Sequence, residues 1–267
     1  MAHTSDHLRH EIRNYNILRR STELGLQFRL KKIRIHLFGL TGHGKSALIN
    51  TFLCVFHNSE YQIVANEEHP ERGTGGGTTV DLQYYQLLRT CVDIVDNRGC
   101  TRFSFGEQTE YRRQMEGERQ LLSDVEFMDD WKANLLSPFL WFEQLWNESK
   151  DQSALVVPIL VMSKTYPWGT EMLGRVHQFC SVVCRYTGVY PIIVATFGQE
   201  NDGNHETELF PDLPGAKFLV NNYNVTSMER NQKTDEDILR ILKLSLDYAD
   251  RILVNCRNFR KKPRVFN

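Results

Sequence analysis

Residues 39–46 read Gly-Leu-Thr-Gly-His-Gly-Lys-Ser, a complete G-x-x-x-x-G-K-[ST] phosphate loop. A strand-like run at 33–38 precedes the loop, and a helix-like run at 47–53 follows it. This order of strand, loop and helix is the context that the motif requires. Glycines let the backbone fold around an anion, so that its N–H groups and the following helix N-terminus face phosphate. The motif therefore predicts an α/β fold with a phosphate site at the end of a strand.

The residues of the loop have separate expected roles. Lys45 is expected to reach the β- and γ-phosphates, and Ser46 to ligate Mg²⁺. His43 is expected to point outward from the loop. The expected nucleotide-binding residues here are Gly39, Thr41, Gly42, His43, Gly44, Lys45, Ser46 and Ala47.

Strand-like and helix-like segments alternate along the rest of the chain. Helical periodicity is also present near 111–122, and an aromatic cluster lies at 131–146. Continuous apolar strands that alternate with helices predict a mostly parallel sheet with helices on both faces, the three-layer P-loop NTPase fold. The expected strands are 82–88, 91–96, 155–162, 190–197 and 216–220, and the expected later helices are 170–187 and 235–253.

Composition excludes several classes of protein. The net charge is −1 with both signs spread evenly, which gives no support for a nucleic-acid-binding surface. No segment approaches the ~20 apolar residues that a transmembrane helix needs, and the polar N-terminus lacks a secretory apolar core. The six cysteines are scattered without C-x-x-C spacing, so we expect a reduced, cytoplasmic protein.

A second motif follows the strand at 91–96, which ends in Asp96-x-x-Gly99. A carboxylate at that strand end can hold Mg²⁺, and the Gly99 N–H can face a γ-phosphate. Thr79 ends a glycine-rich stretch and could close on Mg²⁺ when triphosphate is bound. The predicted metal site is therefore Ser46, Thr79 and Asp96. The alternatives are a surface aspartate with a turn glycine, and a polar linker around Thr79.

These motifs, with Gly-Lys-Ser-Ala-Leu-Ile-Asn at 44–50, resemble those of the translation-factor-related GTPases. More narrowly, the chain is similar to the interferon-induced protein 44 family, where the last strand runs into an Asn-Tyr pair before a closing helix. The resemblance implies a GTPase-like domain at 31–255, between a helical arm at 1–30 and a basic tail at 256–267. It also implies Mg²⁺ and GTP as cofactors, with ATP not excluded.

The base-reading motif departs from the GTPase pattern. By the count of elements it begins at Thr196, and Gln199 stands where the guanine-reading acid should be. Phe197 could stack on the base, so Thr196 and Phe197 are the expected base-side residues. If the preceding strand is used instead, Tyr166 takes the place of the acid. Asp202 could substitute only in a bulged loop, so guanine preference rests on the resemblance.

Hydrolysis is expected to be slow, and no catalytic residue is identified. Many small GTPases have a water-orienting glutamine directly after the Asp-x-x-Gly glycine, whereas this chain has Cys100. Arg72, Arg98 and Arg102 are arginine-finger candidates by proximity only, and each is more often a solvated loop charge.

Three functions remain open at this point. The first is a cytoplasmic switch or assembly protein whose 67–80 loop and post-Gly99 region become ordered with nucleotide, and which meets a protein partner or a second copy through these loops. The second is a kinase-like transferase with a basic lid from 103–150. The third is a degenerate GTPase-like interaction module that uses the aromatic cluster at 131–146.

Overall fold

The computed structural model describes residues 2–26, 30–65, 81–133, 153–197, 210–224 and 230–261. Within these ranges the chain forms a six-stranded sheet of order β2-β3-β1-β4-β5-β6. Every neighbouring pair is parallel except β2 and β3, which are antiparallel. The strands are β1 (Lys32–Phe38), β2 (Gln83–Gln86), β3 (Val92–Asp96), β4 (Ala154–Ser163), β5 (Ile192–Thr196) and β6 (Lys217–Leu219).

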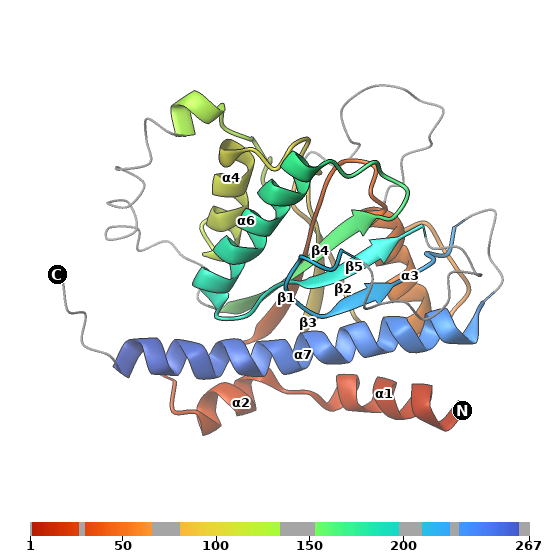
Figure 1. Cartoon of the computed structure of the whole chain (residues 1–267). Helices are drawn as coiled ribbons and strands as arrows, with labels where there is room; N and C mark the ends of the chain where they lie inside the picture. Colours follow the sequence, from red (N-terminus) through yellow and green to blue (C-terminus); the bar gives the residue numbers. More distant parts are fainter. Residues whose placement is uncertain are drawn as a thin grey trace.

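Helices cover both faces of this sheet, so the predicted three-layer P-loop NTPase fold is confirmed. In Figure 1, α4 and α6 lie above the strands and α7 runs below them. The helices are α1 (Ala2–Asn14), α2 (Ile17–Glu23), α3 (Lys45–His57), α4 (Phe105–Met115), α6 (Thr170–Thr187) and α7 (Gln232–Lys261).

Alternation along β1 divides the core into two layers. Ile33, Ile35 and Leu37 belong to the hydrophobic cluster that includes α3 and α7. Phe38 faces the other way, with its ring centroid 4.7 Å from that of Tyr111 in α4 and 5.6 Å from that of Phe179 in α6. Successive side chains of a strand point to opposite faces, which is why a continuous apolar run is needed for a strand covered on both sides.

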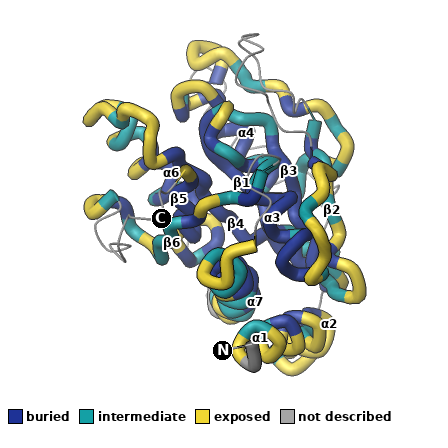
Figure 2. The backbone as a smooth tube through the Cα atoms, turned by 90° about the vertical axis from the view of Figure 1, so that its right-hand side faces the viewer, coloured by how far each residue is buried: buried dark blue, intermediate teal, exposed yellow. Residues whose placement is uncertain are grey.

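The N-terminal helices α1 and α2 pack outside α7 (Figures 1 and 2). Ile12 and Ile17 are buried in the cluster shared with α7. The Tyr15 hydroxyl donates to Asp250 Oδ1 at 2.7 Å, and Arg9 Nε donates to the Val55 carbonyl at 3.1 Å. The expected helical segment at the N-terminus is therefore attached to the globular core.

The bounds of two helices differ from those predicted. α4 begins at Phe105 because Ser104 and Glu107 form a capping box, and it stops before Gly117, which has a φ of +75°. The periodicity near 111–122 had placed this helix too late. α7 continues to Lys261, beyond the predicted end. None of the described helices is long and apolar enough to cross a bilayer.

Candidate nucleotide site

β1 leads directly into the phosphate loop at the carboxyl edge of the sheet. Gly44 has a φ of +80° and caps α3, so Lys45, Ser46 and Ala47 form the first turn of that helix. A Cβ on Gly39 would lie 2.3 Å from the Val161 carbonyl oxygen, which makes glycine obligatory there. The loop thus presents backbone N–H groups and a helix N-terminus in the arrangement that favours anions. Gly42 shares the left-handed backbone, with a φ of +76°.

The Lys45 ammonium folds back over the loop. Its Nζ donates to the Leu40 carbonyl at 2.9 Å and to the Gly39 carbonyl at 3.3 Å, and the residue is buried. Both acceptors are neutral oxygens, whereas a phosphate oxygen is charged and forms a stronger hydrogen bond with an ammonium group. The Lys45 ammonium group therefore lies against the loop in which the motif predicts a phosphate site.

Ser46 and Asp96 meet at the same edge. The Ser46 hydroxyl donates to Asp96 Oδ2 at 2.8 Å, and Asp96 is almost fully buried at the end of β3. β1 and β3 are adjacent and parallel, so the sequence-predicted pair is brought together by sheet topology. A hydroxyl and a carboxylate are hard oxygen donors that fit Mg²⁺, which usually takes one or two protein ligands along with phosphate and water. The third predicted ligand, Thr79, lies outside the described residues.

The Asp96-x-x-Gly99 turn is joined to the phosphate loop by backbone hydrogen bonds. Thr41 N donates to the Cys100 carbonyl at 2.9 Å, and Cys100 N donates to the Gly39 carbonyl at 3.1 Å. A Cβ on Gly99 would lie only 2.6 Å from the Thr41 backbone nitrogen. Glycine is therefore required at 99 because two backbones meet there.

Residues at the ends of β5 and β6 contact the other half of the loop. The Thr196 hydroxyl donates to the His43 carbonyl at 2.9 Å, and Asn222 Nδ2 donates to the Gly44 carbonyl at 3.1 Å. Phe197 is 47% exposed, and its Cε2 would lie 3.6 Å from a Cβ on Gly44. Thr196 and Phe197 therefore lie beside the loop, as the element count predicted.

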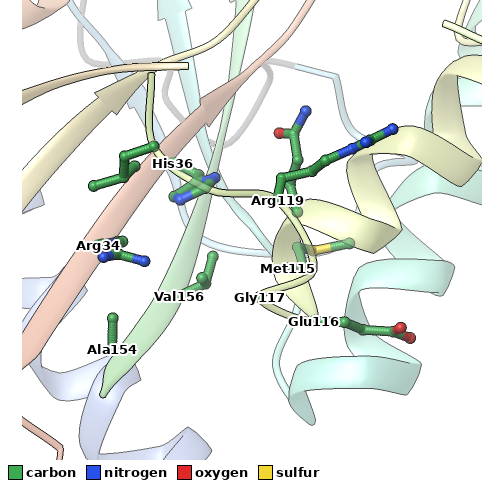
Figure 3. A pocket seen from close by; sticks show the side chains of 10 residues that line it. Arg34, His36, Met115, Glu116, Gly117, Arg119, Ala154 and Val156 are labelled. Carbon is green, nitrogen blue, oxygen red and sulfur yellow. The ribbon is translucent and has the colours of Figure 1, made fainter. Parts of the chain in front are cut away.

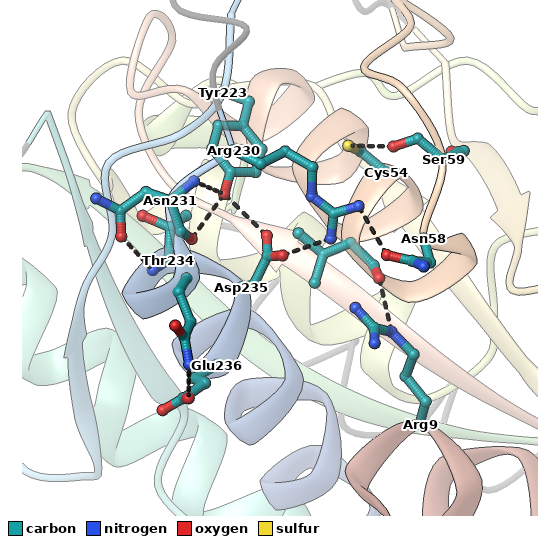
Figure 4. Close-up of polar contacts among 12 residues, drawn as sticks. Arg9, Cys54, Asn58, Ser59, Tyr223, Arg230, Asn231, Thr234, Asp235 and Glu236 are labelled. Atoms are coloured by element: carbon teal, nitrogen blue, oxygen red, sulfur yellow. Dashed lines mark hydrogen bonds and ion pairs between the residues drawn. The ribbon is translucent and has the colours of Figure 1, made fainter. Parts of the chain in front are cut away.

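Sequence reasoning missed Asn222 as part of this site. Its place beside the loop could have been predicted, because Asn222 follows the last strand of the sheet and parallel strands end at the same edge. The next residue anchors the segment: Tyr223 N donates to Thr51 Oγ1 at 3.1 Å, and the Tyr223 hydroxyl contacts Asp235 Oδ1 at 2.8 Å. Arg230 also bonds to Asp235 (Figure 4). The network holds the turn after β6 against α3 and α7.

The prediction that His43 points outward is wrong. The side chain is 3% exposed, and its Nδ1 accepts a hydrogen bond from Ser163 N at 3.2 Å. Its ring packs against Tyr166 and Trp168, at centroid distances of 5.0 and 5.3 Å. Burial, with a smaller contribution from the Lys45 charge, lowers the pKa of His43 to about 4. The loop turns this side chain inward, so only its backbone can face a ligand.

Several hydrolysis candidates are engaged elsewhere or lie outside the described residues. Arg98 Nη1 donates to the Val125 carbonyl at 2.9 Å, and its guanidinium lies 5.5 Å from the centroid of the Phe127 ring. Cys100 is fully buried, and burial is the main cause that raises the pKa of its thiol to about 12. A protonated thiol cannot act as a general base. Gln199, Asp202 and Arg72 lie outside the described residues.

A separate small cavity lies between the sheet and the end of α4 (Figure 3). It encloses about 40 Å³ and is lined by polar side chains that include Arg34, His36 and Arg119. Within the described part of the chain, neither ring nitrogen of the buried His36 has a hydrogen-bond partner. Burial, followed by the charge of Arg34, lowers the pKa of His36 to about 3. The cavity shares no lining residue with the phosphate loop.

Solved structures include chains that are similar to this one. The chain is similar to the crystal structure of Toc33 from Arabidopsis thaliana in complex with Mg²⁺ and GMPPNP, with 14% sequence identity and a TM-score of 0.42. The match covers 88% of this chain and 91% of that chain. At this level the likeness carries no argument, and the fold assignment rests on the strand order and the loop. No family model and no curated protein matches the sequence.

Proposed function

We propose that this protein binds a Mg²⁺–purine nucleoside triphosphate, with GTP preferred, and acts as a nucleotide-dependent switch or assembly protein. The observation that carries the proposal is the contact of the Ser46 hydroxyl with the Asp96 carboxylate, at 2.8 Å, beside a complete phosphate loop. A surface aspartate that only happened to follow a strand would not be buried against the loop serine. The Asp96-x-x-Gly99 signature favours a switch over a kinase-like transferase, because a glycine at that turn can offer its N–H to a γ-phosphate.

Each residue of the site has a proposed role that follows from its chemistry. Backbone N–H groups of the loop bind phosphate oxygens, and Lys45 exchanges its carbonyl partners for the β- and γ-phosphates. Ser46 and Asp96 would hold Mg²⁺, and the bound ion would supply positive charge against the phosphates. Phe197 offers a ring face to the base.

The GTP preference is supported by the resemblance to the interferon-induced protein 44 family. Slow hydrolysis is supported by Cys100, which stands where many small GTPases have a water-orienting glutamine and whose thiol is fully buried. A reduced, cytoplasmic location is supported by the six cysteines, which are scattered without C-x-x-C spacing. A protein partner or a second copy would meet the chain through the switch loops, the 67–80 loop and the region after Gly99.

Calorimetry on the full chain tests the proposal. The native protein is titrated with GTP, ATP, GDP and ADP in Mg²⁺, alongside Lys45→Ala. The matched control is Lys243→Ala, which removes an ammonium that binds Asp247 on α7. We expect one GTP per chain, at least about ten-fold weaker binding in Lys45→Ala because a charge-assisted hydrogen bond is lost, and no change in Lys243→Ala.

Two other outcomes would contradict the proposal. Tighter binding of ATP than of GTP would overturn the base preference. Absence of binding to the native chain would overturn nucleotide binding altogether and leave the interaction module.

A further inference from the structure

The segment from Asn97 to Ser104 is tied to α4 along almost its whole length. Within it, every residue except Gly99 makes a polar contact with an α4 side chain. The first contact is between two buried amides: Asn97 Nδ2 donates to Gln114 Oε1 at 2.5 Å. The Phe103 carbonyl accepts from Gln108 Nε2 at 2.8 Å. This segment contains the turn that meets the phosphate loop.

The Tyr111 hydroxyl lies at the centre of these contacts. It accepts from Cys100 N at 3.1 Å, and it donates to the Arg98 carbonyl at 3.1 Å, with the Gly39 carbonyl more distant at 3.5 Å. Tyr111 is fully buried. One hydroxyl from α4 therefore touches the residues on both sides of Gly99 and lies beside the start of the phosphate loop.

Glu107 holds the second half of the segment. Its carboxylate accepts from Thr101 N at 2.6 Å, from the Thr101 hydroxyl at 2.9 Å, from Arg102 N at 3.2 Å and from Ser104 N at 2.8 Å. Only the last of these is the capping-box contact that starts a helix. The other three bind the chain before the helix, so the carboxylate organises the connection as well as the cap.

These contacts differ from what an order–disorder switch needs. A segment that becomes ordered only with triphosphate has few contacts of its own in the free protein. In the structure the backbone groups on either side of Gly99 are bonded to α4 and to the loop. Moving the segment would leave buried donors such as Cys100 N without partners, which is unfavourable.

We propose that Tyr111 is a positioning residue that presets the Gly99–Cys100 backbone against the phosphate loop. The segment 97–104 then keeps one conformation whether or not nucleotide is bound. This inference rests on the proposed function, because its role is to present the Gly99 N–H to a γ-phosphate. It replaces the expectation that the region after Gly99 becomes ordered with nucleotide.

The first test requires no nucleotide. Hydrogen exchange is measured for the 97–104 amides in the native chain and in Tyr111→Phe, which removes only the hydroxyl. The control is Tyr15→Phe, which removes a half-buried hydroxyl bonded to Asp250, outside the site. Cys100 N keeps its bond to the Gly39 carbonyl in Tyr111→Phe but loses its second acceptor, the hydroxyl. We therefore expect its exchange to be about five-fold faster in Tyr111→Phe, as for the loss of one net hydrogen bond, and unchanged in Tyr15→Phe. Unchanged exchange in Tyr111→Phe overturns the proposal.

The second test separates positioning from a general structural role. Affinities for GMPPNP and GDP are measured by calorimetry for the same variants. We expect Tyr111→Phe to weaken GMPPNP about five-fold and to leave GDP unchanged, because only the triphosphate reaches Gly99. Equal weakening of both ligands, or a native 97–104 segment whose exchange slows at least ten-fold with GMPPNP, overturns the proposal.

A second variant covers the case in which Tyr111→Phe does not fold. Glu107→Gln keeps the side-chain size but removes the charge that binds the 101–104 backbone, and we expect faster exchange there with the same selective loss of GMPPNP affinity. If the native chain binds neither nucleotide, the proposed function fails and the role toward γ-phosphate fails with it. The exchange experiment would still report whether Tyr111 fixes the segment.

Discussion

Replacing Gly99 with alanine tests the join between the Asp96-x-x-Gly99 turn and the phosphate loop. The added Cβ would lie 2.6 Å from Thr41 N and Cα and 2.7 Å from Thr41 Oγ1. Ordinary contacts of a Cβ begin at 3.4 Å, so the closest approach is 0.8 Å too short. Two of the three clashing atoms are backbone, so the turn and the loop must move apart.

The energetic cost follows from that movement. Overpacking costs about 1–3 kcal/mol. Separating the two segments also strains the hydrogen bonds between Thr41 and Cys100 and between Cys100 and Gly39, which are 2.9 and 3.1 Å long. Each contributes about 1 kcal/mol net. We therefore expect Gly99→Ala to lower the free energy of unfolding by about 2–5 kcal/mol.

Urea denaturation of the native chain, Gly99→Ala and Gly174→Ala measures this difference. Gly174 lies in α6, and a Cβ there would meet nothing within 4 Å, so alanine should stabilise the helix by about 0.5–1 kcal/mol. In the fraction of Gly99→Ala that folds, triphosphate affinity should also fall. A stability for Gly99→Ala within about 0.5 kcal/mol of the native value would refute the close approach of the two segments.

Three further predictions concern the pH dependence of stability, the role of Asp96 in Mg²⁺ binding and the stacking of Phe197 on the nucleotide base. Burial lowers the pKa of His36 to about 3 and that of His43 to about 4, below the usual histidine value of 6.5. Between those values and pH 6.5 the unfolded chain therefore binds more protons than the folded chain. Stability should then fall as pH drops below 6.5, by up to about 1.4 kcal/mol per pH unit for each histidine; a pH-independent urea midpoint between pH 6.5 and 5 would contradict this. Asp96→Asn should reduce the dependence of triphosphate affinity on Mg²⁺, measured by calorimetry with and without EDTA, because Ser46 remains as a ligand but a carboxylate charge is lost; a dependence equal to that of the native chain would contradict the role of Asp96. Phe197→Ala should weaken nucleotide binding by about 1–3 kcal/mol if its ring stacks on the base, whereas Phe105→Ala, another exposed phenylalanine, should have no effect.

The main features of the fold could be predicted from local patterns. The loop motif, the buried strands and the order of elements were enough for a three-layer sheet, because continuous apolar runs and alternation with helices reflect burial directly. The approach of Ser46 to Asp96 was also predictable. It requires only that two adjacent parallel strands end at one edge of the sheet.

Contacts made by single side chains across elements were harder to predict. Whether His43 turns inward depends on the space between the ends of β4 and β5, which no pattern around the loop encodes. Asn222 contacts the loop from the far end of the chain, and the Tyr111 hydroxyl acts from a helix whose start was misplaced. The Ser104-x-x-Glu107 spacing would have corrected that start, since it is a capping-box signature.

The central claim is that the loop at 39–46 binds a Mg²⁺–nucleoside triphosphate. Its most direct test is a calorimetric titration of the native chain with GTP, first in Mg²⁺ and then in EDTA. Binding of one GTP per chain, markedly weaker in EDTA, is the predicted result. The absence of binding in Mg²⁺, with the protein folded and monodisperse, would contradict the claim.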